Sequence, residues 1–90
     1  MITWDEPKRL LNIDSHGIDL ASVESVFDFP MYTWEDDTEA YGEKRLRSLC
    51  WLHGRVVYLV WTDRGSSAHV ISCRDGSKHE TKKYYAFAFG

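Results

Sequence analysis

The feature that most constrains the fold is a pair of apolar runs, KRLRSLCWL and RVVYLVWT, separated only by His53 and Gly54. A two-residue connection that ends in glycine, between two apolar runs, is typical of a β-hairpin. In the register that this turn sets, Cys50 faces Val57 across the hairpin. Because side chains alternate along a strand, the register also divides the hairpin residues between two faces of a sheet.

The two faces of this hairpin differ in composition. The first face is largely apolar and holds Leu46, Cys50, Leu52, Val57, Leu59 and Trp61. The second face is amphipathic and holds Arg45, Arg47, Leu49, Trp51, Val56, Tyr58 and Val60. Large rings beside arginines are typical of protein interfaces, so the second face is a candidate binding surface. The alternative is that the chain's own helices cover it.

Two helices and a strand are predicted before the hairpin. Residues 5–15 read as a helix that Asp5 caps and Gly17 ends. Residues 20–27 read as a second short helix capped by Asp19. Residues 31–36 alternate as a strand does, and residues 36–43 read as a polar, acidic loop.

After the hairpin, the turn DRGSS leads to a further strand, AHVISCR. Residues 77–85 read as a helix in which Ser77 and Glu80 have the spacing of a capping box. The predicted fold is therefore α+β, with N-terminal helices, an antiparallel meander of about four strands and a C-terminal helix. A chain of 90 residues is expected to form a single domain over residues 1–90.

Composition narrows the class of protein. No apolar run approaches the roughly 20 residues that span a bilayer. The start MITWDEPKRL lacks the pattern of a signal peptide, so the expected compartment is the cytoplasm, without membrane contact. Cys50 and Cys73 lie in strand-like runs and are expected to be buried thiols rather than a disulfide. The four histidines are scattered and neither cysteine has ligand spacing, so no metal site and no cofactor is predicted.

The formal net charge of −3 hides a division between the two halves of the chain. Residues 1–43 contain two basic and eleven acidic residues, a net −9, whereas residues 44–90 contain nine basic and three acidic residues, a net +6. Such a split is typical of a chain that binds an anionic partner with one half and a basic partner with the other. It is equally typical of two halves that neutralise each other within one fold.

The basic half ends in SCRDGSKHETKKYY, residues 72–85, whose side chains suit a phosphate-bearing ligand. Arginine and lysine bind phosphate, histidine and glutamate transfer protons, and tyrosine can stack on bases. The alternative is a solvated helix with i, i+4 ion pairs.

Five pieces of the sequence, in order, resemble the BrnT family, which comprises toxins of bacterial toxin–antitoxin pairs. The first is Trp4-Asp5 followed by Lys8, Asn12 and His16-Gly17. The others are VFDFP, EDDTEAYGE, GRVVYLVWTDR, and VISCR followed by KHETKKY. The resemblance extends from Trp4 to about Tyr85.

This resemblance implies a RelE-like ribonuclease fold and a cytoplasmic endoribonuclease toxin of a type II toxin–antitoxin system that arrests translation. It implies that RNA is cut without a metal, through the 2′-hydroxyl. It also implies a BrnA-like ribbon-helix-helix antitoxin that neutralises the toxin in a hetero-oligomer, with promoter DNA bound only through that complex. The alternative is a catalytically weak or inactive interaction protein of the same fold that serves as antitoxin partner or co-repressor.

For such a reaction, the residues of the basic half receive predicted roles. Arg64 and Arg74 would hold the charged phosphorane, and His79 and Glu80 would transfer protons. Glu80 is favoured as the base because the family pattern has a glutamate there, and a structural role in a cap or ion pair is the alternative. The residues predicted to bind RNA are Lys78, Lys82, Lys83 and Tyr84. Those predicted to bind the antitoxin are Arg45, Arg47, Trp51 and Tyr58.

Overall fold

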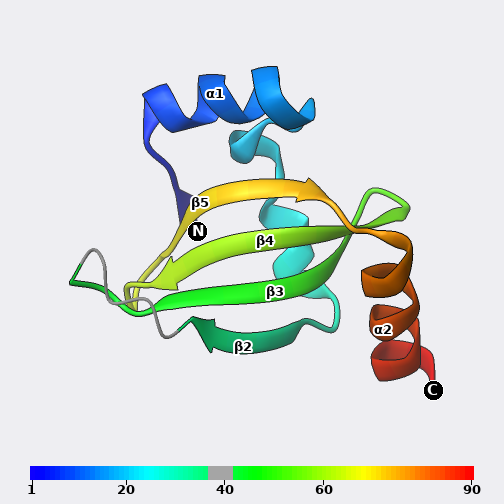
Figure 1. The fold of residues 1–90 in the computed structure, drawn as a ribbon. Coiled ribbons are helices and arrows are strands. Elements are labelled where there is room, and N and C mark those ends of the chain that lie inside the picture. The colour runs from blue at the N-terminus through cyan, green and yellow to red at the C-terminus, as the bar shows by residue number, and fades with distance from the viewer. Residues whose placement is uncertain (37–41) are drawn as a thin grey trace.

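Five strands form one mixed sheet in the computed structural model, which describes residues 1–36 and 42–90 (Figure 1). The strand order is β1-β5-β4-β3-β2. In chain order the elements are β1 (Ile2–Thr3), α1 (Glu6–His16), the 3₁₀ helices η1 (Leu20–Ser22) and η2 (Glu24–Asp28), β2 (Tyr32–Asp36), β3 (Arg45–Leu52), β4 (Arg55–Asp63), β5 (Ala68–Asp75) and α2 (Lys78–Phe89). The α+β class is confirmed. Most of the acidic loop predicted for residues 36–43 lies outside the described residues.

The sheet corrects the expected antiparallel meander of about four strands. A fifth strand, β1, pairs with β5 in parallel, with Ile2 beside Ala68 and Thr3 beside His69. A strand of two residues is too short to show alternation, so the pattern of the sequence could not reveal it. The other neighbouring strands pair antiparallel, as predicted.

The hairpin of β3 and β4 has the predicted register. Cys50 pairs with Val57, as expected from the two-residue turn. His53 and Gly54 both adopt positive φ, 47° and 88°, which matches the right-handed twist of the two strands. On the other side of β4 the register shifts between Val60 and Trp61, where β5 carries a bulge.

The first face of the sheet carries the main core. Its floor is built from β3, β4 and β5. Leu20 of η1, Val26 of η2 and Val23 between them are all fully buried against it. The predicted helix over residues 20–27 is instead two 3₁₀ helices that meet at Val23. Asp19 caps the first of them as predicted, accepting a hydrogen bond from the Ala21 backbone N–H at 2.9 Å. Short 3₁₀ segments are common as connectors between other elements.

Helix α1 lies along the edge of β5 that β1 leaves uncovered (Figure 1). The Asn12 side chain donates to the Cys73 carbonyl at 2.9 Å and accepts from the Cys73 N–H at 3.0 Å. This amide therefore pairs with β5 as a neighbouring strand would, which satisfies the backbone N–H and carbonyl of Cys73 at a buried sheet edge. Gly17 ends the helix in the left-handed conformation, as predicted, at φ 68°. Asp5 is the N-cap residue, but its side chain makes no capping hydrogen bond.

The second face of the sheet is covered at one end by α2. Tyr84 of this helix is buried against Leu49 and Val56 and donates a hydrogen bond from its hydroxyl to the Pro30 carbonyl at 2.9 Å. Ser77 and Glu80 form the predicted capping box at the start of α2. The helix runs to Phe89, four residues beyond the predicted end.

The charges of the two halves of the sequence meet within the fold. Ion pairs join Lys44 to Glu35 at 3.9 Å and Arg64 to Glu43 at 3.0 Å. This observation supports the reading in which the halves neutralise each other. Both cysteines are free and buried, as expected, and burial raises the pKa of each thiol. No helix within residues 1–36 and 42–90 is long and apolar enough to cross a bilayer.

Candidate functional site

Two guanidinium groups converge on one tyrosine on the second face of the sheet. The Cζ atom of Arg74 lies 4.1 Å from the centroid of the Tyr58 ring, and that of Arg47 lies 5.8 Å from it. Arg47 also donates from Nη1 to the Tyr58 hydroxyl at 2.9 Å. These three residues come from β5, β3 and β4, so a rigid sheet fixes their spacing. The side chain of Arg74 is 40% exposed and that of Arg47 is 32% exposed, so solvent reaches both cations.

Each of these arginines is also held by a carboxylate. Arg74 donates from both Nη atoms to the two oxygens of Glu80, at 2.9 and 3.0 Å. Arg47 donates from Nε and Nη2 to one oxygen of Asp36, at 2.9 and 2.7 Å. These hydrogen bonds to carboxylates raise the pKa of both guanidinium groups, so both remain cationic.

Glu80 has two partners, and together they hold it as a carboxylate. The hydrogen bonds from Arg74 and from the Ser77 backbone lower the pKa of Glu80 to about 2. The structural role that was the alternative for this residue, capping with Ser77, is therefore present. While it is paired with Arg74, a carboxylate with so low a pKa is a weak proton acceptor near neutral pH.

The connection between β5 and α2 sets where Glu80 meets Arg74. Gly76 donates its backbone N–H to the Val56 carbonyl at 2.9 Å. A Cβ at this position would approach the same carbonyl oxygen to 3.1 Å, so the chain passes β4 at a distance that favours glycine. The helix therefore begins immediately after the strand, and its first turn faces the end of β5.

Arg64 lies away from this cluster, although it was expected to hold the phosphorane together with Arg74. It follows β4 and pairs through Nε and Nη2 with the two oxygens of Glu43, at 3.1 and 3.0 Å. Arg74 is paired in register with Tyr58, six residues before Arg64, which is roughly 20 Å along a strand at about 3.3 Å per residue. The turn from β4 to β5 and the end of β5 lie at opposite ends of the sheet (Figure 1).

The lysines of α2 divide between different sides of the helix. Lys83 is over the ring of Tyr32, with Nζ 5.1 Å from the ring centroid. Lys78 and Lys82 are exposed and, at about 100° of rotation per residue, lie about 160° around the helix from Glu80. His79 is exposed beside Glu80, on the side of the helix that carries Lys83.

Tyr84 does not belong to the accessible surface, although it was expected to bind RNA. It is 1% exposed and its hydroxyl is already bonded to the Pro30 carbonyl. Its ring fills the space between α2 and the sheet, since an aromatic side chain on the inner side of an amphipathic helix gains most by burial. This burial removes Tyr84 from the candidate RNA-binding residues.

Comparisons with known proteins identify the family to which this fold belongs. The profile of the family described as "Ribonuclease toxin, BrnT, of type II toxin-antitoxin system" matches residues 4–80. The chain belongs to the BrnT family. The fold is also similar to the crystal structure of the Brucella abortus ribonuclease toxin BrnT, with a TM-score of 0.70 and 31% sequence identity, over 86% of this chain and 96% of that one. No curated protein sequence matched the chain.

The BrnT profile match ends at Glu80, within the first turn of α2. The cluster of Arg47, Tyr58, Arg74 and Glu80 therefore lies wholly within the part of the chain that carries the family match. Lys82, Lys83 and Tyr84 lie beyond it.

The residues predicted to bind the antitoxin fall into two environments in this BrnT-family fold. Trp51 is half-buried under α2, where it stacks on Tyr84 with ring centroids 6.5 Å apart. Arg47 and Tyr58 belong instead to the arginine cluster, and Arg45 lies two residues before Arg47 on the same face. The chain's own helix therefore covers the Trp51 end of the face, whereas Arg47 and Tyr58 share the surface of Arg74.

Sequence reasoning missed Trp34 and Asp36, which both border the cluster from β2. The Trp34 ring meets Tyr58 edge to face at 5.8 Å between centroids, and Asp36 binds Arg47. The alternation of MYTWED placed these two residues on one face of a strand. What it could not show was that this face lies beside Arg47 of β3.

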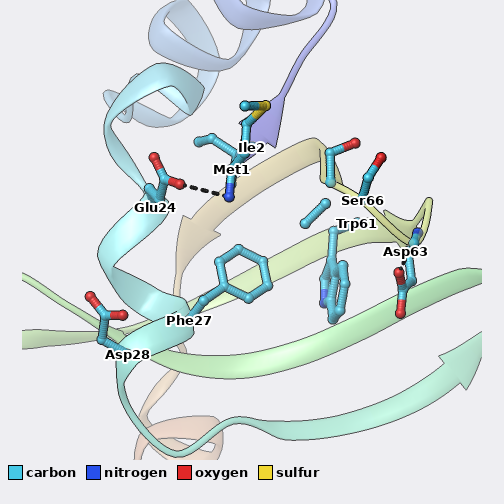
Figure 2. Close-up of a pocket in the computed structure, with 11 residues that line it drawn as sticks. Met1, Ile2, Glu24, Phe27, Asp28, Trp61, Asp63 and Ser66 are labelled. Carbon is cyan, nitrogen blue, oxygen red and sulfur yellow. Dashed lines mark hydrogen bonds and ion pairs between the residues drawn. The ribbon is translucent and has the colours of Figure 1, made fainter.

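A pocket of about 340 Å³ opens on the first face of the sheet, and it is acidic (Figure 2). Phe27 and Trp61 meet edge to face at its floor, 5.1 Å between ring centroids. Around them stand Glu24, Asp28 and Asp63, and Glu24 binds the amino group of Met1 at 3.1 Å. These carboxylates disfavour a phosphate ligand, so the second face is the better candidate for an RNA surface.

The described residues contain no group of three or more His, Cys, Asp and Glu side chains arranged to hold a metal ion. The arginine cluster of the second face consists of Arg47 and Arg74, the carboxylates of Asp36 and Glu80 that bind them, and Tyr58.

Proposed function

We propose that this chain is an endoribonuclease toxin that cuts RNA by metal-independent transesterification and so arrests translation. The observation that supports this most directly is the convergence of Arg74 and Arg47 on Tyr58, on an accessible surface of a BrnT-family fold. Two fixed cations over one small area suit the phosphorane of a phosphoryl-transfer transition state, whose charge is spread over the non-bridging oxygens. No cofactor takes part in the proposed reaction.

The proposed step is an in-line attack by the ribose 2′-oxygen on the adjacent phosphorus. The bond from phosphorus to the 5′-oxygen of the next nucleotide breaks as the new bond forms. Glu80 accepts the proton of the 2′-hydroxyl, and protonated His79 donates a proton to the departing 5′-oxygen. The products are a 2′,3′-cyclic phosphate and a 5′-hydroxyl. Arg74 and Arg47 stabilise the negative charge on the non-bridging oxygens of the phosphorane transition state.

The low pKa of Glu80 gives this proposal a specific sequence of events. A phosphate that binds Arg74 bidentately competes with Glu80 for the same guanidinium donors. Once displaced, Glu80 loses the interaction that contributes most to its low pKa, and its basicity rises beside the substrate. Arg64 belongs to this proposal only as a distant phosphate contact, because it lies near the other end of the sheet.

The proposed partner is a BrnA-like ribbon-helix-helix antitoxin, which would form a cytoplasmic hetero-oligomer with the toxin. Its binding site would include Arg45, Arg47 and Tyr58, so that the antitoxin blocks the arginine cluster directly. Trp51 would contribute through the shape of α2 rather than through wide contact, because that helix covers part of its ring. Promoter DNA would contact the antitoxin within the complex.

A second candidate function is a catalytically weak interaction protein that acts as co-repressor. The observation that favours it is the pairing of three arginines with carboxylates: Arg47 with Asp36, Arg64 with Glu43, and Arg74 with Glu80. Such pairs reduce the positive potential that attracts RNA.

Expression of the protein alone, followed by analysis of cellular RNA, separates the two candidates. We expect growth arrest and fragmented RNA with 2′,3′-cyclic phosphate ends, and cleavage by the purified protein that persists in EDTA. Normal growth with intact RNA at confirmed expression would leave the interaction protein. Cleavage that stops in EDTA and returns with a divalent ion would overturn the metal-independent step.

A further inference from the structure

Four aromatic rings form a continuous chain that leads away from the arginine cluster. Centroid distances are 5.8 Å from Tyr58 to Trp34, 5.9 Å from Trp34 to Tyr32, and 5.2 Å from Tyr32 to Phe87. The first three rings come from β4 and β2, and Phe87 comes from α2. We call these four residues the aromatic track.

The aromatic track is reachable from solvent, although rings of this size usually gain by burial. Trp34 is 37% exposed and Phe87 is 49% exposed. Trp34 stands on β2, the edge strand of the sheet, so nothing in the strand order lies beyond it. Exposed rings that contact one another form an apolar surface, and such a surface indicates a binding site.

Cations accompany the aromatic track at two of its rings, Tyr58 and Tyr32. Arg74 and Arg47 stand at the Tyr58 end, and Lys83 stands over Tyr32 at 5.1 Å from its centroid. Proteins that bind single-stranded nucleic acid without pairing it combine these two elements, rings on which bases stack and cations along the backbone. Arg74 and Arg47 accompany Tyr58 and Lys83 accompanies Tyr32, so rings and cations are both present along the track.

Resting on the proposed ribonuclease function, we infer that the aromatic track binds unpaired RNA next to the cut site. Bases beside the scissile phosphate stack on Trp34 and on the exposed ring of Phe87, while Lys83 contacts a neighbouring phosphate. A base held in a duplex cannot present its face to these rings, so the track selects single-stranded RNA. Trp34 is then a specificity-determining residue of the site, outside the group that performs the proton transfers.

The test uses an uncleavable 2′-O-methyl RNA of about eight nucleotides, as a single strand and annealed to its complement. Wild-type protein should bind the single strand more tightly than the duplex. Trp34→Leu keeps apolar bulk but removes the stacking ring, and it should weaken single-strand binding about tenfold while leaving duplex binding nearly unchanged. Phe87→Ala should weaken single-strand binding several-fold. Phe89→Ala removes a more exposed ring on another side of the same helix and should leave binding unchanged.

The outcomes distinguish this inference from the proposed function. If wild-type protein cleaves RNA but Trp34→Leu binds both forms as wild type does, the aromatic track is wrong and the ribonuclease stands. If Trp34→Leu instead loses a co-expressed BrnA-like antitoxin while keeping RNA binding, the surface is a protein interface and the inference fails. Wild-type protein that neither binds nor cuts RNA would remove the proposed function and this inference together. Thermal unfolding of each variant shows whether it is folded.

Discussion

The hairpin of β3 and β4 contributes residues to both faces of the sheet, and the two faces differ in burial. On the first face, Cys50, Val57 and Leu59 are fully buried beneath the 3₁₀ helices, and they form the main core. On the second face, α2 covers Leu49 and Val56, whereas Arg47 and Tyr58 remain within reach of solvent and bear the candidate site. Consecutive residues of the hairpin thus alternate between the buried core and the face that bears the candidate site.

This comparison shows that the register of β3 and β4 determines which residues form the candidate site. A slip by one residue would send the arginines into the core and the buried aliphatic side chains into water. The two-residue turn at His53 and Gly54 sets this register, so a change far from the site could abolish it. The comparison also predicts that the two faces respond differently to substitution.

The largest expected effect is on the first face. Leu59→Ala should lower the free energy of unfolding by about 3 kcal/mol, because the site is fully buried and cannot collapse completely around the cavity. The folded fraction should keep its specific activity. Leu10→Ala, at an exposed position on α1, is the matched control and should change stability by less than about 0.5 kcal/mol in urea unfolding. A Leu59→Ala protein with the stability of wild type would contradict the claim that the first face carries the main core.

On the second face, Arg74→Ala should reduce RNA cleavage on the order of 10²-fold, as for the loss of one oxyanion donor. Arg74→Lys should recover little, because a lysine cannot reproduce the bidentate contact. Arg55→Ala provides the control, since Arg55 lies at the same end of the sheet and pairs with Asp75 at 3.2 Å. Equal cleavage rates for the Arg74→Ala and Arg55→Ala variants would place the active site elsewhere.

The edge of the sheet should show a smaller effect. Asn12→Ala removes the hydrogen bonds to the Cys73 backbone and to the Ile18 carbonyl, so it should cost about 2 kcal/mol of stability. Ser15→Ala, at an exposed position on the same helix, should be nearly neutral. Urea unfolding of the two variants provides the measurement, and equal midpoints would show that water replaces the Asn12 amide without loss.

Glu80→Gln should lower stability by about 1–2 kcal/mol at neutral pH, after allowance for solvent screening of a partly exposed pair. The folded state lowers the pKa of Glu80 from 4.5 to about 2. Its contribution is therefore complete above the ordinary pKa and disappears as the pH falls through that range toward 2. Unfolding curves of wild type and variant should converge over this interval. A difference that stays constant down to pH 2 would contradict the ionic role of the pair.

The smallest effect is expected for Lys82→Ala. Because Lys82 lies on the outer side of α2, it should contact RNA only through long-range attraction or one phosphate. Loss of one such contact should reduce the slope of log affinity against log salt by about 0.7 and weaken binding by only a few-fold at moderate salt. A variant with an unchanged slope would show that the bound RNA does not reach this side of the helix.

Local signals in the sequence predicted much of the fold. The dipeptide His53-Gly54 was enough to predict the turn and the register, and the spacing of Ser77 and Glu80 was enough to predict the cap of α2. Both signals depend on residues within a few positions of each other. The pairing of β1 with β5 could not be predicted in this way, because it joins residues that are 66 positions apart.

The site was predictable only in part, for the same reason. Arg74 and Glu80 lie six residues apart, and the sequence was enough to suggest both. Arg64 was expected beside them, but antiparallel pairing alone separates the start of a strand from its end, and that rule should have excluded it. Trp34 was missed because its contact with Tyr58 depends on how β2 pairs with β3.

The pairing of β1 with β5 has a consequence for the order in which the molecule opens. Closing the hairpin orders two turn residues, whereas docking β1 orders a loop of more than sixty, so the hairpin forms at much lower entropic cost. Strand β1 contributes two residue pairs, and α1 buries only Asn12 among its eleven residues. In amide hydrogen exchange, this N-terminal segment should therefore lose protection first, while β3 and β4 exchange only through global unfolding.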